Sequence, residues 1–424
     1  MKRVTLLLAI VFCYFTVFAD EWVKIRSDEA KKAKIELVSS DINKSIIKFS
    51  LDGFLQKKVN TNKGDFYIIT LPRATQLLEQ GAPDLPKLTA SVIIPDQAAM
   101  EVRVLDYKVR EFENYNIAPS KGNLTRDIDP SKVPYEFGAI YKQNAYFPTK
   151  EAFLRDPYII RDFRGQTVVV QPFRYNPVSK TLQVYYDITV EISRTGDNGI
   201  NPLVRNQSLE KVDSEFSKFY DTHFLNASGS SRYDLVPEYG NMLIISHGPF
   251  MDAMQPYVEW RIKAGRPTEI IDVSTIGVNS AAIKSYIANY YNDNGLTFVL
   301  LVGDAAQVPS SFSSGDSDND YTYVVGNDHY PDLFIGRFSA ETEDHVETQV
   351  TRTLEYEQEP YTENDWSTIG TGIASDQGPG DDGEYDYEHI RNINDDLLAY
   401  TYTYCNELFD GNQGGEDEPG NPTP

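Results

Sequence analysis

The pattern of apolar and polar residues changes character near the middle of the chain. Up to about Phe224, short runs alternate between the two kinds of residue, most clearly in Val184–Ile192 (VYYDITVEI). Thr167–Phe173 and Glu101–Tyr107 are further expected strands, and turn signals such as Asn176-Pro177 lie between the runs. Helical periods are scarce in this half. The pattern predicts a β-rich, sandwich-like domain.

After Gly240, expected strands alternate with expected helices. The strands lie at 242–246, 268–273, 298–302, 333–338, 370–375 and 401–405, and the helices at 251–264, 281–292, 343–357 and 387–399. This alternation predicts a parallel, three-layer α/β domain. The strand at 370–375 starts a second sheet that the remaining residues do not finish, so we expect a truncated chain.

Two composition changes divide the chain. The small, polar segment Asn226–Glu238 (NASGSSRYDLVPE) is typical of an exposed linker, which fits an ordinary hinge or a processing site between Arg232 and Tyr233. The Gly/Pro-rich, acidic tail has nothing to bury. We expect a leader at 1–19, a β-rich domain at 20–232 and an incomplete α/β domain at 233–424, itself divided into 233–365, 366–410 and a tail at 411–424.

The charge balance bears on the partners. The 424 residues carry a net charge of −24, with 63 acidic against 39 basic side chains. Binding to nucleic acid depends on clustered Lys and Arg, so this balance argues against a nucleic-acid partner. An acidic surface suits a secreted protein or one that gathers Ca²⁺.

The first residues have the features of a secretory signal peptide. Lys2-Arg3 precedes the apolar run Val4–Phe18, and Val17-Phe18-Ala19 is a loose small-x-small cleavage site. A membrane span needs about 20 apolar residues, and this run is shorter. The sequence therefore predicts a secreted or cell-surface protein without a membrane span.

The two cysteines cannot form an internal disulfide framework. Cys13 would leave with the signal peptide, so only Cys405 remains. No histidine stands at a helpful spacing from Cys405, which favours a core residue over a nucleophile.

Several oxygen-bearing residues follow or flank the most apolar expected strand. Asp304 comes directly after Phe298–Val302, at the strand end where open α/β sheets collect functional groups. Asp328, Tyr330 and Asp332 stand at alternate positions, from which several oxygens could converge on one hard cation. The spacing fits a solvated acidic turn equally well.

Beyond these patterns, three segments together resemble the catalytic core of the gingipain-type cysteine peptidases, a caspase-like family of secreted bacterial endopeptidases. They are 298–304 (FVLLVGD), 324–338 (VVGNDHYPDLFIGRF) and 348–357 (TQVTRTLEYE). Gly81–Pro95 (GAPDLPKLTASVIIP) is similar to the family's propeptide, and Arg232-Tyr233 to the place where that propeptide is removed. The resemblance implies a zymogen that acts on protein or peptide substrates, with its own propeptide as intramolecular inhibitor. Arg126 and Lys132 are weak candidates for the side chain that plugs the substrate pocket.

The family's catalytic pair is not found in this sequence. The resemblance implies a His in a Gly-His-Gly segment and a nucleophilic Cys in an Ala-Cys-Val-Asn-Gly-like segment, and neither segment is present. We therefore expect no catalytic residue in these 424 residues and no activity from them alone. After Ile373-Ala374-Ser375, the family has a Glu that orients the catalytic His. Here Asp376 is the better chemical substitute and Gln377 the better match in position.

Other family roles fall on residues that are present. Gly383-Glu384-Tyr385 places Asp386 where the family has the Asp at the base of its S1 pocket, which implies cleavage after Arg, or after Lys as the alternative. From the sequence alone, Asp386 fits a helix-start Asp equally well. The resemblance also implies two sets of structural Ca²⁺ ligands. The first comprises Asp304, Val325, Asp328, Tyr330 and Asp332, and the second Glu384 and the carbonyl of His389.

Two other function classes remain open at this point. A secreted pseudoenzyme or inhibitor-like protein would explain the missing catalytic pair. A calcium-dependent surface or adhesion module would explain the charge and the acidic loops.

Overall fold

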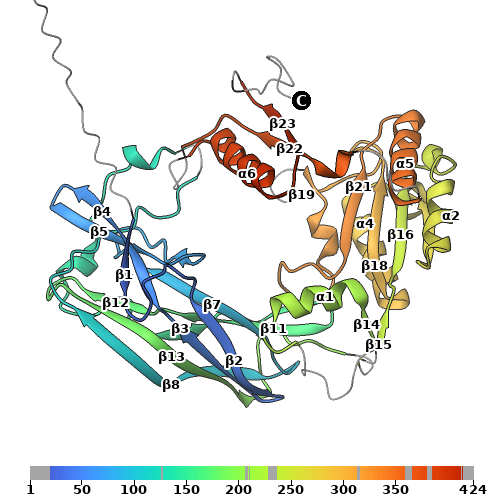
Figure 1. Ribbon diagram of the computed structural model, residues 1–424. Coiled ribbons are helices and arrows are strands. Elements are labelled where there is room, and N and C mark those ends of the chain that lie inside the picture. The colour runs from blue at the N-terminus through green and yellow to red at the C-terminus, as the bar shows by residue number, and fades with distance from the viewer. Residues whose placement is uncertain are drawn as a thin grey trace, which may run out of the picture.

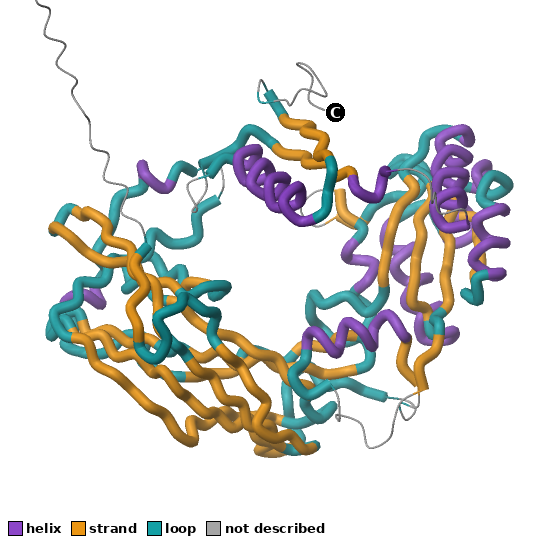
Figure 2. Tube along the Cα trace, in the orientation of Figure 1, coloured by secondary structure: helices purple, strands orange, loops and turns teal. Residues whose placement is uncertain are grey.

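The computed structural model describes residues 20–125, 128–205, 209, 211–227, 236–312, 316–358, 365–379, 384–411 and 413. A β-rich N-terminal part (residues 20–227) is followed by an α/β C-terminal part (residues 236–413), as Figures 1 and 2 show. The predicted fold class is confirmed. None of the described helices is both long and apolar enough to span a membrane.

The N-terminal part is built from antiparallel sheets. One sheet has the order β10-β11-β7-β6 with β9 also on β11, a second has the order β12-β13-β3-β2 with β8 also on β13, and a third has the order β1-β4-β5. The strands are β1 Glu21–Lys24, β2 Lys34–Asp41, β3 Lys44–Ser50, β4 Gly53–Thr61, β5 Gly64–Thr70, β6 Thr75–Gln76, β7 Pro86–Ile93, β8 Ala99–Phe112, β9 Ala152–Leu154, β10 Tyr158–Ile160, β11 Phe163–Val170, β12 Phe173–Asn176 and β13 Thr181–Gly196. Two short 3-10 helices, η1 Pro130–Lys132 and η2 Ala139–Lys142, lie in the connection between β8 and β9.

One apolar core joins these sheets. Alternate residues of β3, such as Ile47 and Phe49, pack with Val168 and Val170 of β11 and with Phe173 of β12. The clean alternation at 184–192 falls inside β13, where the apolar positions are buried. The alternation of apolar and polar residues therefore indicates a strand with one face against the core.

A helix that the sequence pattern did not predict ends the N-terminal part. Helix α1 (Ser214–His223) buries only Phe216 and Tyr220 among its ten residues, which is too short an apolar stripe to stand out. Its N-cap, Asp213, ends the short strand β14 (Lys211–Asp213), which pairs in parallel with β15 (Val236–Glu238). The two parts of the molecule meet here, at the bottom of Figure 1.

The C-terminal part is a three-layer α/β unit. Its sheet has the order β17-β16-β18-β21 with every pair parallel. The main elements are β16 Asn241–Ser246, α2 Gln255–Lys263, β17 Thr268–Asp272, α3 Val273–Ile276, α4 Ser280–Asn294, β18 Leu296–Val302, β21 Phe334–Phe338 and α5 Glu343–Gln358. The connections hold β19 Ser311–Phe312, β20 Asp316–Ser317, and the 3-10 helices η3 Gly248–Phe250, η4 Asn319–Thr322 and η5 Asp365–Thr368.

Both faces of this sheet are covered. Side chains of α2 and α5 pack on one face with Ile244 and Val302, and side chains of α3 and α4 pack on the other with Leu243 and Leu301. Strand β18 is therefore buried on both sides, which explains its unbroken apolar run.

A smaller unit follows, at the top of Figure 1. Strand β22 (Ile369–Ala374) pairs in parallel with β23 (Tyr404–Phe409), and α6 (Asp386–Tyr400) connects them and packs on one face. Gly372 allows close packing, because a Cβ there would lie 2.4 Å from Cγ2 of Ile390 on α6.

Candidate functional site

The register of the parallel sheet separates the residues of the first expected calcium site. Phe298 pairs with Phe334 and Val302 with Phe338, so β18 and β21 run side by side in the same direction. Asp304 follows the carboxyl end of β18, and its N–H donates to Ala340 O at 2.9 Å. Asp332 precedes the amino end of β21, so the length of β18, roughly 20 Å at about 3.3 Å per residue, lies between the two carboxylates.

This separation corrects one prediction. Asp304 does not lie with Asp328, Tyr330 and Asp332, and its Oδ1 accepts a hydrogen bond from Ser339 Oγ at 3.2 Å. Sequence spacing suggested one group of oxygens, but parallel pairing places Asp304 at the opposite edge of the sheet.

Asp328 and Asp332 share a loop at the amino edge of the sheet, and all four of their carboxylate oxygens accept hydrogen bonds from N–H groups. Asp328 Oδ1 accepts from Tyr330 N at 2.9 Å, and Asp328 Oδ2 accepts from Ile159 N at 2.8 Å and Asn201 Nδ2 at 2.7 Å. Two of the three donors to Asp328, Ile159 and Asn201, come from the N-terminal part. Neither belongs to any metal-ligand pattern in the sequence.

Asp332 is completely buried. Its Oδ2 accepts from Val324 N at 2.9 Å and Val325 N at 2.7 Å, and its Oδ1 accepts from Arg161 N at 2.7 Å. Burial raises the pKa of this carboxyl to about 6 against these bonds, which favour the ionised form.

Each of the four carboxylate oxygens of Asp328 and Asp332 accepts an N–H group. Calcium takes six to eight oxygen ligands, and a carboxylate oxygen with one N–H donor keeps a second lone pair. The first calcium site therefore stays a prediction for these two residues. Within the described ranges, no group of three or more His, Cys, Asp or Glu side chains could hold a metal ion.

The second expected calcium pair forms a different contact. The His389 ring Nδ1 lies 3.0 Å from Glu384 Oε2, and Asn392 Nδ2 donates to Glu384 Oε1 at 3.1 Å. The ring of His389 thus faces Glu384, and the use of its carbonyl as a calcium ligand stays a prediction.

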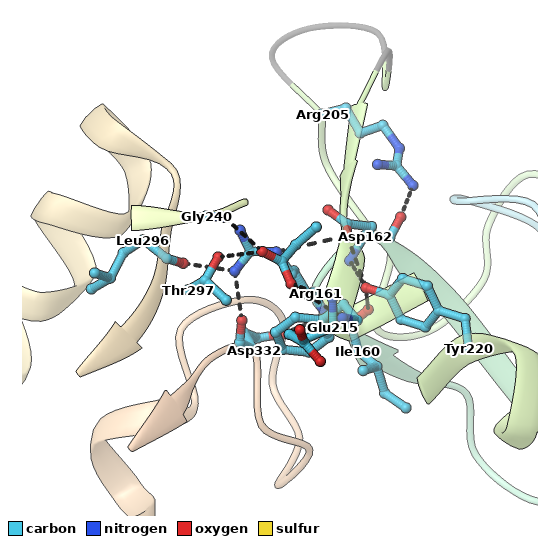
Figure 3. A network of polar contacts seen from close by, with 12 residues as sticks. Ile160, Arg161, Asp162, Arg205, Glu215, Tyr220, Gly240, Leu296, Thr297 and Asp332 are labelled. Carbon is cyan, nitrogen blue, oxygen red and sulfur yellow. Dashed lines mark hydrogen bonds and ion pairs between the residues drawn. The ribbon is translucent and has the colours of Figure 1, made fainter. Parts of the chain in front are cut away.

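Arg161 is the centre of the contact between the two parts, and no sequence signal pointed to it (Figure 3). Its guanidinium Nη1 donates to Leu296 O at 2.7 Å and to Asp332 O at 3.0 Å. The same group lies over the rings of Phe216 and Tyr291, at 5.0 and 5.2 Å from their centroids. A cation between two aromatic rings and two carbonyl oxygens is well solvated by the protein itself.

Asp213 adds a second connection nearby. One of its oxygens, Oδ1, caps α1 by accepting from Glu215 N and Phe216 N, while Oδ2 accepts from Gly240 N at 2.9 Å and Thr297 Oγ1 at 3.3 Å. A single carboxylate thus links the start of α1 to Gly240 and to β18 in the C-terminal part.

The expected specificity residue lies at the start of α6. Asp386 is half-buried, its N–H donates to Gln377 O at 2.9 Å, and its Oδ2 accepts from Ser375 Oγ at 2.6 Å. Asp386 and Gln377 are therefore brought together beyond the carboxyl end of β22, with Asp376 in the same loop. This position at the start of α6 is compatible with both interpretations of Asp386, as a helix-start residue and as the base of a substrate pocket.

The remaining predicted residues either make ordinary structural contacts or lie outside the described residues. Cys405 is buried, and its Sγ lies 3.9 Å from Asn394 O of α6, as expected for a core residue. Lys132 pairs with Asp129 at 3.1 Å on η1. Arg126, Arg232 and Tyr233 lie outside the described residues.

Comparison with known proteins gives two family matches in tandem. The family profile Propeptide_C25 matches residues 28–223, and the profile Peptidase family C25 matches residues 236–419. Gingipain R2 of Porphyromonas gingivalis (strain ATCC BAA-308 / W83) is 35% identical over 395 residues, which are 91% of this chain and 53% of that protein. Gingipain R1 of Porphyromonas gingivalis is 38% identical over 373 residues, 86% of this chain and 37% of that protein.

One similar solved structure corresponds to only part of this chain. The complex of Porphyromonas gingivalis RgpB pro- and mature domains is 35% identical, covers 46% of this chain and 96% of that chain, and has a TM-score of 0.43. The chain spans about half the length of Gingipain R2.

Proposed function

The chain belongs to the gingipain-type cysteine peptidases, peptidase family C25, and on this basis we propose that it is the precursor of a secreted cysteine endopeptidase. The observation that carries the proposal is the tandem match. A propeptide profile ends at residue 223 and a peptidase profile begins at residue 236, on either side of the Arg232-Tyr233 step. The N-terminal part is then the propeptide, and cleavage after Arg232 separates it from the catalytic domain.

We further propose cleavage after arginine, with Asp386 as the residue that receives the substrate guanidinium. Two relatives are named Gingipain R, and Asp386 lies half-buried beside Ser375 Oγ at the start of α6. A half-buried carboxylate forms short, charge-assisted hydrogen bonds to a guanidinium. Arginine can form two parallel bonds of fixed geometry to it, whereas a lysine ammonium acts as a point charge. Lysine is the weaker alternative.

The catalytic pair is proposed to lie in sequence beyond Pro424. In the described residues, Cys405 is buried against α6 rather than set beside a histidine base. The first check is the reading frame past Pro424, in which we expect a Gly-His-Gly segment and a later Cys within about one domain length, ~100 residues. A stop codon directly after Pro424 would remove the peptidase proposal.

An assay of the protein from the complete reading frame then tests the specificity. We expect hydrolysis of peptides with Arg at P1 to exceed that of otherwise identical Lys peptides. Asp386→Asn should lower kcat/KM for the Arg peptide by a factor on the order of 100, since removing one partner of a desolvated charge pair costs about 2–5 kcal/mol. The matched control is Asp395→Asn, an exposed aspartate later in α6. Equal loss on Arg and uncharged P1 peptides would reduce Asp386 to a structural helix-start residue.

A further inference from the structure

A cavity of about 290 Å³ in the N-terminal part has no role in the proposed chemistry. It lies between the start of β8, the residues that follow β9 and the loop at 198–200, with buried side chains of β11 on its inner side. All the residues that line it belong to the N-terminal part. Its size is at the lower end of the range for small-molecule pockets.

The inner side of the cavity carries a buried cation. Arg164 is 1% exposed and makes no ion pair with any described residue. It donates four hydrogen bonds, all to carbonyl oxygens, namely those of Pro95, Ala98, Ile200 and Asn201. A guanidinium has five N–H groups, so one remains.

The charge of Arg164 is only partly compensated by the protein. Burial lowers the pKa of Arg164, although the negative charge of Asp96 nearby opposes this. The carboxylate of Asp96 itself pairs with Arg205 at 2.6 Å. Because a buried charge is most stable when an opposite charge faces it, this side of the cavity favours an anionic group.

Gln166 adds an unpaired acceptor beside this cation. Its side chain is 6% exposed, and its Nε2 donates to Arg155 O at 2.9 Å. Its Oε1 accepts no hydrogen bond within the described part of the chain. Buried polar atoms are nearly always paired, so an unpaired one at a cavity indicates that a partner is missing.

Two opposite charges line the outer side of the cavity. Arg155 and Asp156 are both exposed, and no ion pair joins either of them to a described residue. Lys87 lies close by, because burial and the positive charge of Arg155 both lower the pKa of Lys87. The cavity thus presents several cationic groups and one carboxylate, none of which has found a partner of opposite charge.

We propose that this cavity binds a zwitterionic small molecule of the α-amino-acid class. The ligand carboxylate pairs with Arg155 and with the remaining N–H of Arg164, and the ligand ammonium pairs with Asp156. Gln166 Oε1 adds negative potential for that ammonium, and the ligand side chain packs on Met100 and Leu154. A simple anion would leave Asp156 repelled, and a simple cation would leave the two guanidinium groups unpaired, so a zwitterion fits both charges.

Three probes of matched shape separate the two charges. L-leucine carries both, 4-methylpentanoate lacks the ammonium, and 3-methylbutylamine lacks the carboxylate. Isothermal titration calorimetry on the full chain at low salt measures the Kd of each probe. We expect the Kd of L-leucine to be lower than that of either other probe by about tenfold or more, because charge-assisted hydrogen bonds are the strong ones.

Two substitutions of exposed residues then test the assignment. Arg155→Gln should raise the Kd of L-leucine and of 4-methylpentanoate by about tenfold. Asp156→Asn should raise the Kd of L-leucine by about tenfold but not that of 4-methylpentanoate. The controls are Arg73→Gln and Asp221→Asn, exposed residues elsewhere in the N-terminal part, which should leave every Kd unchanged. Thermal unfolding without probe checks that all four variants are folded.

Three results would overturn the proposal. They are no binding of L-leucine, equal Kd values for the three probes, and equal effects of the cavity variants and their controls. Equal Kd values would show that only the apolar part of the probe is bound. The readout measures binding to the N-terminal part alone, so this proposal and the peptidase proposal can fail separately.

Discussion

Asp84 shows how burial of one carboxyl group affects stability. It is largely buried in the N-terminal part, and burial raises its pKa from 3.8 to about 6 although Gln76 Nε2 donates to it at 3.1 Å. The folded state therefore holds the proton more tightly than the unfolded state. Stability contributed by the protonated form is present below pH 4 and is lost as the pH rises to about 6.

Asp84→Asn should remove this loss. We expect the variant to be more stable than the parent at pH 7 by roughly 2–3 kcal/mol and about equally stable at pH 3.5, measured by urea unfolding. Asp65→Asn is the control of opposite sign, because its hydrogen bond with Lys58 lowers the pKa of Asp65. Asp65→Asn should not raise the free energy of unfolding at pH 7. If Asp84→Asn raised the free energy of unfolding equally at pH 3.5 and pH 7, the explanation would be contradicted.

At the scale of single elements, α1 depends on one residue that also holds the C-terminal part. Asp213→Ala removes the cap, at about 1 kcal/mol, and leaves buried Gly240 N and Thr297 Oγ1 without their acceptor, so the total loss should be about 2–4 kcal/mol. Asp213→Asn keeps a capping oxygen and should cost less. Asn279→Ala, which removes the α4 cap alone, should cost about 1 kcal/mol.

Urea unfolding and amide hydrogen exchange of α1 check this order. If Asp213→Ala costs no more than Asn279→Ala, the contact to the C-terminal part contributes nothing measurable. Faster exchange confined to the first turn of α1 would lead to the same conclusion.

Element types were largely predictable from the sequence, because burial pattern and hydrophobic period are local properties. The unbroken run 298–302 predicted the doubly covered strand β18, and alternation at 184–192 predicted β13. Helix α1 was missed, since only Phe216 and Tyr220 form its apolar stripe. The partners of Asp328 and Asp332 could not be predicted, because Ile159 and Arg161 lie 169 and 171 residues away in sequence. A carboxylate that accepts N–H groups and one that binds a cation have the same local pattern.

At the scale of the whole molecule, the contact between the two parts is separate from the candidate residues at strand ends. The amino edge of the four-stranded sheet holds the N-terminal part through Arg161, Asp328 and Asp332, whereas Asp304 follows the carboxyl end of β18, and Asp386 follows β22 of the separate two-stranded sheet. Substitutions at this contact therefore leave the candidate residues Asp304 and Asp386 unchanged, and the two regions can be tested independently.

The same contacts bear on the predicted calcium ligands. The expected ligands Asp328 and Asp332 accept three N–H groups from the N-terminal part, two of them from the β10–β11 hairpin, so a calcium ion would compete with these donors for the carboxylate lone pairs. Two ligands that compete for the same atoms weaken each other's binding equally. In the intact chain, we therefore expect no rise in Tm with Ca²⁺ over EGTA that depends on Asp328. The measurement is thermal unfolding of the parent and of Asp328→Asn with and without Ca²⁺. A calcium-dependent rise that Asp328→Asn abolishes in the intact chain would show that the ion and the hairpin bind together.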